Sequence, residues 1–237
     1  MPPGTSWLNA RLLSREQTII ARLTQYMAEL DRSAGQFGNA PIEALALGCT
    51  GTGYVVGPAQ EDALLSSLAQ RLGVPVFSAA TAVCDALRCL QAGTVLLVSP
   101  YDAAVYEASL PYWQERGQST QSPFVVSHCI SLPSVKGFHP IYARQSEALD
   151  TALDQNREAV AAADAVVILG TGMPTLAAIK RYRDETGGNT PLLSCMLCLG
   201  WQSAVTLGAA SNDLQTLLAW SRGETWSPRL SQRLGMP

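Results

Sequence analysis

Two segments of the chain repeat one plan, and this repeat constrains the fold more than any other feature of the sequence. In residues 44–53 an apolar run too short for a helix ends in a Gly-Cys-Thr-Gly turn that carries Cys49. Residues 164–174 follow the same plan, but Gly170 takes the place of the cysteine. A second pair of similar segments, 75–83 and 191–199, follows in the same order and at a similar spacing. The sequence therefore predicts a duplicated unit.

Each apolar run is typical of a buried parallel strand, which delivers the side chains after it to the carboxyl edge of a sheet. α/β proteins place their chemistry at this edge. Two like halves that face each other would bring Cys49 and the Gly170 turn to opposite walls of one cleft. We expect one half to comprise residues 1–80 plus about 205–237, and the other to comprise residues from about 81 to 204.

Strand patterns alternate with helical patterns along the chain, which predicts an α/β fold with two doubly wound parallel sheets. Ser14 is a plausible helix cap, and Pro58 stands where another helix should begin. The predicted strands are 7–12, 42–48, 74–78, 94–99, 124–127, 165–169 and 191–195. The predicted helices are 14–32, 58–73, 81–91, 102–116, 146–163, 174–186, 198–207 and 212–221, and an irregular tail follows them.

Composition narrows the class of protein. The chain has 237 residues, enough to bury a large core in one or two domains. A net charge of -3 and scattered basic residues argue against a nucleic-acid partner. No apolar run is long enough to span a bilayer, and the first residues lack the plan of a signal peptide. The six cysteines are few for this length, which favours reduced thiols and a cytoplasmic protein.

Five motifs follow one another along the chain: Cys49-Thr50-Gly51, residues 78–83, Ser99-Pro100-Tyr101, Gly170-Thr171-Gly172 and residues 191–201. Together they resemble the aspartate/glutamate racemase superfamily, and within it the branch of maleate cis–trans isomerase and arylmalonate decarboxylase. The resemblance covers roughly residues 40–208. It implies two pseudo-symmetric α/β domains with the active site between them, and neither a metal nor an organic cofactor. It also implies thiols at the two symmetry-related turns, which act on a carbon next to a carboxylate.

The chain departs from this pattern in two places. Gly170 stands where the second cysteine of the family should fall, so two-thiol racemisation is not expected. The family also begins with a strand and a Pro-rich loop that helps to hold a substrate carboxylate, often through an asparagine. Here the chain starts around that loop, residues 1–4 resemble its remnant, and Asn9 is not a secure match for the asparagine.

The retained thiol favours the isomerase side of the branch. There the cysteine at the first turn, which is Cys49 here, resembles the nucleophile that adds to a double bond and permits rotation before elimination. In the decarboxylase branch the single cysteine, which protonates a carbanion, lies at the second turn, where this chain has Gly170. The position of Cys49 would equally suit a decarboxylase of opposite facial selectivity.

The candidate catalytic residue is Cys49, whose thiolate could be stabilised, and its pKa lowered, by nearby backbone N–H groups. The alternative is a buried structural cysteine at a tight turn. Candidate substrate-binding residues would hydrogen-bond a carboxylate or a developing enediolate, although several also suit plain turn chemistry. They are Thr50, Gly51, Ser99, Tyr101, Gly170, Thr171 and Gly172.

Other conspicuous side chains are weaker candidates. Cys195 and Cys198 have a C-x-x-C spacing, but without a second pair or a nearby histidine zinc is not expected. Cys195 ends a predicted strand at the cleft edge and could replace the missing second thiol. The remaining assignments are to the core for Cys84 and Cys89, to the surface or a loop anchor for His128 and His139, and to either an apolar pocket wall or the core for Phe77, Met173 and Trp201.

Three hypotheses follow. The first is a cofactor-independent isomerase that acts on a small carboxylate such as a cis-unsaturated diacid, with Cys49 as nucleophile. The second is a decarboxylase of a malonate-type acid, with Cys49 as proton donor. The third is a binding protein that kept the cleft and lost the chemistry. All three imply a small carboxylic acid as ligand, and each allows a homo-oligomer.

Overall fold

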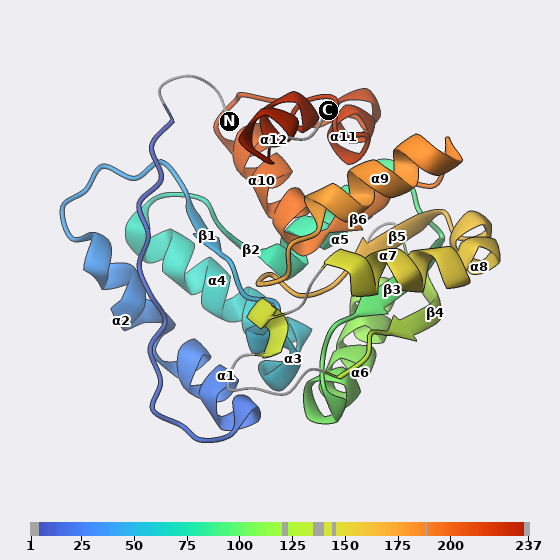
Figure 1. Ribbon diagram of the computed structural model, residues 1–237. Helices are drawn as coiled ribbons and strands as arrows, with labels where there is room; N and C mark the ends of the chain where they lie inside the picture. Colours follow the sequence, from blue (N-terminus) through green and yellow to red (C-terminus); the bar gives the residue numbers. More distant parts are fainter. Residues whose placement is uncertain (1–4, 120–122, 135–139, 144–145, 188, 235–237) are drawn as a thin grey trace.

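The computed structural model describes residues 5–119, 123–134, 140–143, 146–187 and 189–234 (Figure 1). Parallel strands and helices alternate, as predicted for an α/β fold. The strands are β1 (Leu45–Leu47), β2 (Val76–Ser78), β3 (Thr94–Ser99), β4 (Val125–Ser131), β5 (Ala165–Ile168) and β6 (Leu192–Ser194). The first helices are α1 (Ile19–Ala28), α2 (Leu30–Ala34), η1 (Gly35–Phe37), α3 (Gly51–Val56), α4 (Pro58–Leu72), α5 (Ala79–Leu90) and α6 (Ala103–Ser119). The later helices are η2 (Pro140–Ala143), α7 (Ser146–Gln155), α8 (Arg157–Ala162), α9 (Leu176–Thr186), α10 (Cys195–Thr206), α11 (Leu214–Ser221) and α12 (Ser227–Leu234).

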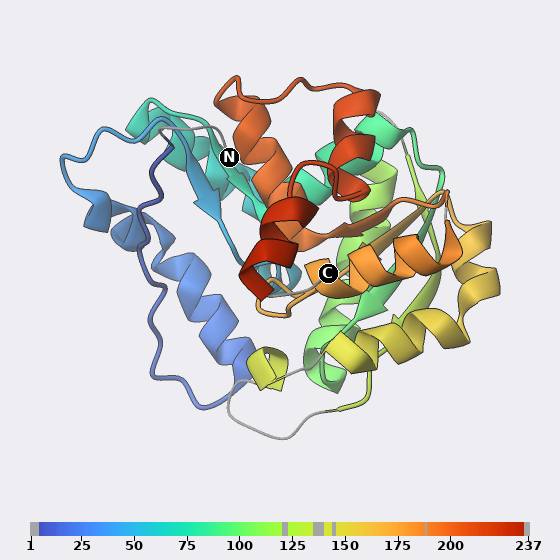
Figure 2. The same ribbon diagram turned by 45° about the horizontal axis from the view of Figure 1, so that its top comes forward.

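The strands form two separate parallel sheets. β1 pairs with β2, and the larger sheet has the order β4-β3-β5-β6. In Figure 1 the small sheet lies with α1–α4 on one side of the molecule, and the large sheet lies with α6–α9 on the other. Helices α5 and α10 pack against each other, and α11 contacts both of them. In Figure 1 α10–α12 lie toward the top of the molecule, and Figure 2, in which this top comes forward, shows α12 in front.

The predicted duplication is visible in how the strands enter their helices. β2 ends at Ser78, whose hydroxyl accepts a hydrogen bond from the Thr81 N–H and caps α5. β6 ends at Ser194, whose hydroxyl accepts from the Leu197 N–H and caps α10. Serine is a preferred cap because its oxygen satisfies one of the free N–H groups at a helix start. Both helices therefore begin directly after their strands, earlier than the predicted residues 81 and 198.

Burial is concentrated where the pattern of apolar residues predicts it. β3 and β5 are buried along nearly their whole length because helices cover both faces of the large sheet. One apolar cluster joins this sheet to α5, α9 and α10. A smaller cluster holds α1, α2 and α4 against β1. In the described part of the chain, no helix is long and apolar enough to cross a membrane.

Several other predicted segments also differ from the structure, and β4 extends to Ser131, beyond the predicted residues 124–127. Residues 7–12 form no strand among the described residues, and Trp7 and Leu8 are 54% and 53% exposed because no sheet face covers them. The first helix begins at Ile19 with Thr18 as its cap, well after Ser14, and it is followed by the separate helix α2. The predicted helix 146–163 is divided at Asn156. The tail is not wholly irregular, since it contains α12.

Candidate active site

Cys49 stands between β1 and α3, at the carboxyl edge of the small sheet. β1 ends at Leu47, Thr50 is the cap residue of α3, and the thiol between them is half-buried. The Thr52 N–H, the Thr52 hydroxyl and the Gly51 N–H all hydrogen-bond the Cys49 thiol. The Thr52 hydroxyl also lies 2.9 Å from the Cys49 carbonyl, and its single proton goes either to this carbonyl or to the sulfur. The start of α3 therefore places three donor groups around one sulfur atom.

The pKa of Cys49 differs from the sequence-based expectation of a lowered value. Burial raises the pKa of the thiol, and this effect outweighs the three hydrogen bonds that lower it. The negative charge of Glu61 raises the pKa further. Because burial dominates, the Cys49 thiol is neutral at rest. The hydrogen-bond donors around it would stabilise the thiolate once it forms.

A direct hydrogen bond joins the Cys49 turn to the large sheet. The Thr50 hydroxyl lies 2.9 Å from the Tyr101 hydroxyl, and either can be the donor. Tyr101 follows Ser99, the last residue of β3, and the Tyr101 N–H donates to the Ser99 hydroxyl at 3.4 Å. The structure therefore brings together three predicted residues from two separate motifs, namely Thr50, Ser99 and Tyr101.

Tyr54 and Trp113 extend this polar contact into the core. The Trp113 indole N–H donates to the Tyr54 hydroxyl at 3.2 Å, and Tyr54 in turn hydrogen-bonds Thr50 and Tyr101. The rings of Tyr54 and Tyr101 meet edge to face, with centroids 5.7 Å apart. Sequence reasoning missed both residues. The available signal for Tyr54 was its position four residues after Thr50, one helical turn along the same face.

Burial keeps the tyrosine hydroxyls of this network protonated. The pKa of Tyr54 and the pKa of Tyr101 both lie well above the ordinary value, chiefly because each ring is buried. Neighbouring thiols, Cys195 above all, raise the pKa of Tyr101 further. Tyr101 can therefore donate a hydrogen bond to an anionic ligand at any physiological pH.

The Gly170 turn lies at the matching edge of the large sheet. β5 lies beside β3, with Ile168 opposite Val98, so Gly170 leaves the sheet close to Pro100. Gly170 has φ +91°, and a Cβ added there would lie 2.6 Å from Pro100 Cγ and 2.7 Å from Ile141 Cδ1. A side chain at this position is therefore excluded both by backbone conformation and by space.

Helix η2 covers the rest of this turn. A Cβ added at Gly172 would lie 2.6 Å from the Tyr142 ring and 3.1 Å from Ile141 Cγ2. Tyr142 is 70% exposed, so one face of its ring covers the turn while the other faces solvent. Thr171, between the two glycines, is half-buried. Ile141 and Tyr142 were not predicted, because nothing in their own sequence indicates what they cover.

Cys195 is the first residue of α10, not the end of a strand as predicted. It is completely buried, and the Gly170 N–H and the Thr50 hydroxyl both hydrogen-bond its thiol. Burial is the larger effect and raises the pKa of Cys195 to about 12. Cys195 thus contacts both of the turns that the sequence singled out.

Most of the remaining predicted residues lie in the core or pack against it. Cys84 is buried as expected, Cys89 is half-buried against the core, and His128 is exposed on β4. His139 lies outside the described residues. Phe77, Met173 and Trp201 are all buried in the main apolar cluster, so they belong to the core. All six cysteines are free thiols, and no group of side chains within the described ranges could hold a metal ion.

A buried ion pair holds α4 against α6 behind the Cys49 turn. Arg116 Nη2 lies 2.8 Å from Glu61 Oε2, and the Tyr112 hydroxyl donates to the same carboxylate oxygen. Glu61 is completely buried and Arg116 is 6% exposed. A Cβ added at Gly53 would lie 2.7 Å from Glu61 Oε2, so this glycine lets α3 approach the carboxylate. The pair holds α4 and α6 together, and α3, the helix that follows Cys49, packs against both of them.

Comparison with known proteins now connects this geometry to a family. The family model described as arylmalonate decarboxylase matches residues 12–218, most of the chain. The chain belongs to the arylmalonate decarboxylase family. This confirms the resemblance found in the five motifs and extends it toward both ends of the chain.

The proteins similar to this chain include maleate isomerases and arylmalonate decarboxylase. Maleate isomerase of Geobacillus stearothermophilus is 31% identical over 172 residues, which make up 70% of this chain and 64% of that enzyme, so the chain spans less than two thirds of its relative's length. A solved structure of Nocardia farcinica maleate cis–trans isomerase has a TM-score of 0.74 at 22% identity, covering 91% of this chain and 88% of that one. A glycine-to-cysteine mutant of arylmalonate decarboxylase has a TM-score of 0.60 at 23% identity, covering 80% and 75%. At these identities the two structures establish the shared fold.

Proposed function

We propose that the protein is a cofactor-independent isomerase of small unsaturated carboxylic acids, with Cys49 as its nucleophile. The observation that carries this proposal is the Cys49 turn, where three hydrogen-bond donors surround a half-buried thiol beside the Thr50–Tyr101 pair. A chemical parallel is the Nocardia farcinica isomerase, whose cysteine-to-serine mutant holds a covalently bound succinylcysteine intermediate. Maleate, the cis-unsaturated diacid for which both relatives are named, is the substrate to test first.

In this reaction the Cys49 thiolate adds to one carbon of the double bond. The electron pair of that bond moves toward the neighbouring carbon and its carboxylate, which becomes an enediolate. The former double bond is now single and can rotate. Expulsion of the Cys49 thiolate then re-forms the double bond in the trans geometry, so covalent catalysis replaces one difficult rotation with two easier steps.

The groups around Cys49 suit the charges that develop. Before attack the Thr52 and Gly51 donors stabilise the thiolate. After attack the negative charge resides on the substrate carboxylate, where a protonated Tyr101 and the Thr50 hydroxyl can donate hydrogen bonds. Thr171, Gly172 and the backbone of the Gly170 turn would bind the far side of the ligand, as proposed from the sequence.

Decarboxylation of a malonate-type acid is the second candidate, and the match to the arylmalonate decarboxylase family favours it. In that reaction carbon dioxide leaves, and a neutral thiol protonates the resulting enediolate. The raised pKa of Cys49 means that the thiol keeps its proton near neutral pH, as a proton donor requires.

Proton NMR of the protein with maleate and, separately, with phenylmalonate distinguishes these activities. Fumarate in the first sample supports the isomerase. Phenylacetate with release of carbon dioxide in the second supports the decarboxylase. If neither substrate changes and no small carboxylic acid exchanges its α-proton with deuterated solvent, the catalytic proposal fails and a carboxylate-binding protein is left.

A further inference from the structure

Helix α1 places a tyrosine beside the Cys49 turn. A Cβ added at Gly51 would lie 3.0 Å from Leu23 Cδ1, so α1 packs directly on the first turn of α3. Tyr26 follows Leu23 by three residues, on the same face of α1. Its ring is half-buried and packs against the main apolar cluster, as Cys49 does. Tyr26 therefore lies at the edge of the candidate active site, and no step of the reaction above uses it.

The Tyr26 hydroxyl is close to groups from both halves of the molecule. Burial raises the pKa of Tyr26 most, and the neighbouring Cys49 thiol and Tyr142 hydroxyl raise it further. Such electrostatic effects fall off with distance, so the Tyr26 hydroxyl is near both groups. Tyr142 belongs to η2, and its ring would lie 2.6 Å from a Cβ added at Gly172. In Figures 1 and 2 η2 lies next to α1. Tyr26 is therefore close both to the proposed nucleophile and to the helix that covers the second turn.

Two arginines give this position a positive potential. Burial, the largest effect, keeps the pKa of Tyr26 raised even though the guanidinium groups of Arg22 and Arg11 lower it. Arg22, one helical turn before Tyr26, is 4% exposed and donates to the Glu16 and Gln17 carbonyls at 3.3 and 3.5 Å. Arg11 is exposed, and in the described part of the chain no carboxylate pairs with it. A neutral O–H donor in a positive field suits a carboxylate ligand.

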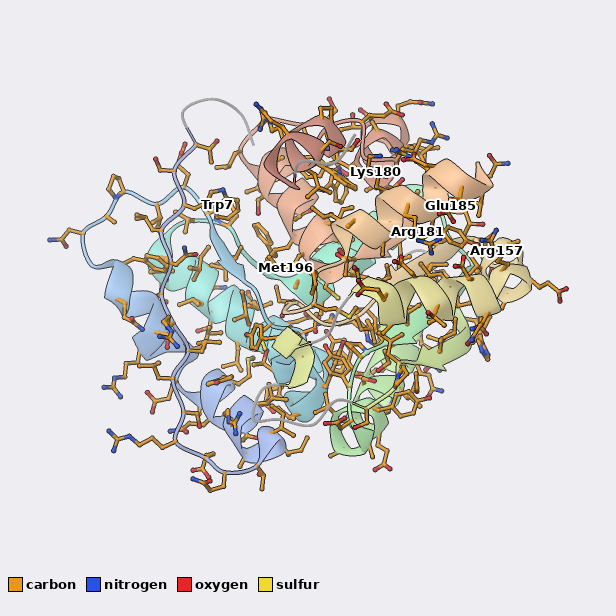
Figure 3. All side chains as sticks on the ribbon, in the orientation of Figure 1. Trp7, Arg157, Lys180, Arg181, Glu185 and Met196 are labelled. Carbon is orange, nitrogen blue, oxygen red and sulfur yellow. The ribbon has the colours of Figure 1, made fainter. Side chains whose placement is uncertain are left out.

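The other prominent group of cationic side chains lies elsewhere. Arg157, Lys180 and Arg181 are on α8 and α9, and Glu185 pairs with both arginines. In Figure 3 these side chains are on the opposite side of the molecule from α1. The positive potential at Tyr26 therefore comes from Arg22 and Arg11, on and just before its own helix.

We propose that Tyr26 binds the second carboxylate of a diacid substrate and thereby makes the site selective for diacids. The proposal rests on the proposed function, in which Tyr101 and Thr50 bind the carboxylate that becomes an enediolate. Tyr101 reaches the Cys49 turn from the end of β3, whereas Tyr26 reaches it from α1, so two phenols are available for the two ends of a short diacid. The Tyr26 O–H donates a hydrogen bond to a carboxylate oxygen, and no covalent bond forms or breaks. A monocarboxylic acid of the same length would leave this donor without an anion.

The test measures binding, so it needs no turnover. Succinate and butyrate have the same chain length, differ by one carboxylate, and contain no double bond to which Cys49 could add. Calorimetric titration gives the Kd of each acid for wild type, Tyr26→Phe and Tyr106→Phe. Tyr106 is the matched control because it is also half-buried and its hydroxyl hydrogen-bonds a half-buried thiol, that of Cys129.

Wild type should bind succinate at least about tenfold more tightly than butyrate. Tyr26→Phe should weaken succinate binding roughly 10- to 100-fold, the range for one hydrogen bond to a charged group, and should leave butyrate binding unchanged. Tyr106→Phe should match wild type with both acids. A merely structural role of Tyr26 would weaken the binding of both acids equally, and this result would overturn the proposal. Wild type that binds succinate no more tightly than butyrate, or Tyr26→Phe with wild-type affinity for succinate, would overturn it as well.

Turnover of maleate by the same proteins separates this proposal from the proposed function. If wild type isomerises maleate and Tyr26→Phe has the same KM, the role of Tyr26 fails and the proposed function stands. If succinate binding depends on Tyr26 but wild type changes neither maleate nor phenylmalonate, the proposed function fails and Tyr26 stands as the residue that selects diacids.

Discussion

The hydroxyl groups of Thr50 and Tyr101 lie 2.9 Å apart and join the turn after β1 to the turn after β3. These residues are far apart in the sequence, and the strands that they follow, β1 and β3, belong to different sheets. The contact holds the Cys49 turn at a fixed position against the large sheet, while Tyr54 and Trp113 support it from the core.

Tyr101→Phe removes this link and leaves the ring in place. We expect kcat/KM to fall roughly 10- to 100-fold, because one charge-assisted hydrogen bond to the substrate carboxylate is worth about 1.5–3 kcal/mol. The free energy of unfolding should fall by only about 1 kcal/mol. Tyr106→Phe, the same change on α6, is the control and should leave kcat/KM unchanged. Equal activity of wild type and Tyr101→Phe would contradict the binding role of Tyr101.

The pH dependence of the reaction should report the Cys49 thiol. Because burial raises its pKa, the thiolate fraction grows with pH through neutrality, and kcat/KM for isomerisation should rise tenfold per pH unit until the pKa of Cys49 is passed. Thr52→Val removes one donor that lowers this pKa, so its profile should be displaced to higher pH. Thr24→Val, at an exposed position on α1, should leave the profile in place. A profile that falls with rising pH would show that the neutral thiol is the reactive form.

Gly170 is required by both its backbone conformation and its neighbours. Gly170→Ala should destabilise the protein by more than the roughly 1–2 kcal/mol that left-handed backbone costs an L-residue, because the new Cβ also meets Pro100 and Ile141. Gly73→Ala isolates the backbone effect, since Gly73 is left-handed with φ +69° and has nothing within 4 Å of an added Cβ. Chemical denaturation of both variants gives the difference. Equal losses of stability would show that Pro100 and Ile141 can move to make room for the added Cβ.

The buried Glu61–Arg116 ion pair should contribute far more to the free energy of unfolding than the exposed Asp62–Arg116 ion pair does. Glu61→Gln leaves Arg116 buried without its full counter-charge and should cost about 3–5 kcal/mol. Asp62→Asn removes the second partner of Arg116, but the Asp62 side chain is 54% exposed, so the cost should be about 0–1 kcal/mol. Urea unfolding of the two variants measures both costs. A small effect of Glu61→Gln would mean that water or a rearranged Tyr112 compensates.

The sequence allowed the prediction of those parts of the fold that depend on short-range pattern. The apolar run Thr94–Ser99 matches β3 at both ends, and Pro58 begins α4 as predicted. The segment 7–12 was misread because Leu8, Ala10 and Leu12 alternate with polar residues as in a strand, while the exposure of such a segment depends on which elements lie nearby. The tail was misread because it carries Gly and Pro near the start of α12.

The site was predictable where the motifs themselves carry the chemistry. Cys49, Thr50 and Tyr101 were each named from a motif that follows a predicted strand, and the structure brings the Thr50 and Tyr101 hydroxyls together. The raised pKa of Cys49 could not be predicted, since burial depends on the packing of distant elements. The same holds for Ile141 and Tyr142, which cover the Gly170 turn from a helix that no pattern placed there.

The most direct test of the central claim is the dependence of turnover on Cys49 itself. Initial rates of maleate isomerisation, or of phenylmalonate decarboxylation if that is the observed activity, are measured for wild type, Cys49→Ala and Cys89→Ala. Cys89 is the matched control because it is also a half-buried free thiol, on α5. We predict that Cys49→Ala loses at least about a thousandfold in kcat while it remains folded, and that Cys89→Ala equals wild type. A Cys49→Ala variant with wild-type turnover would contradict the account.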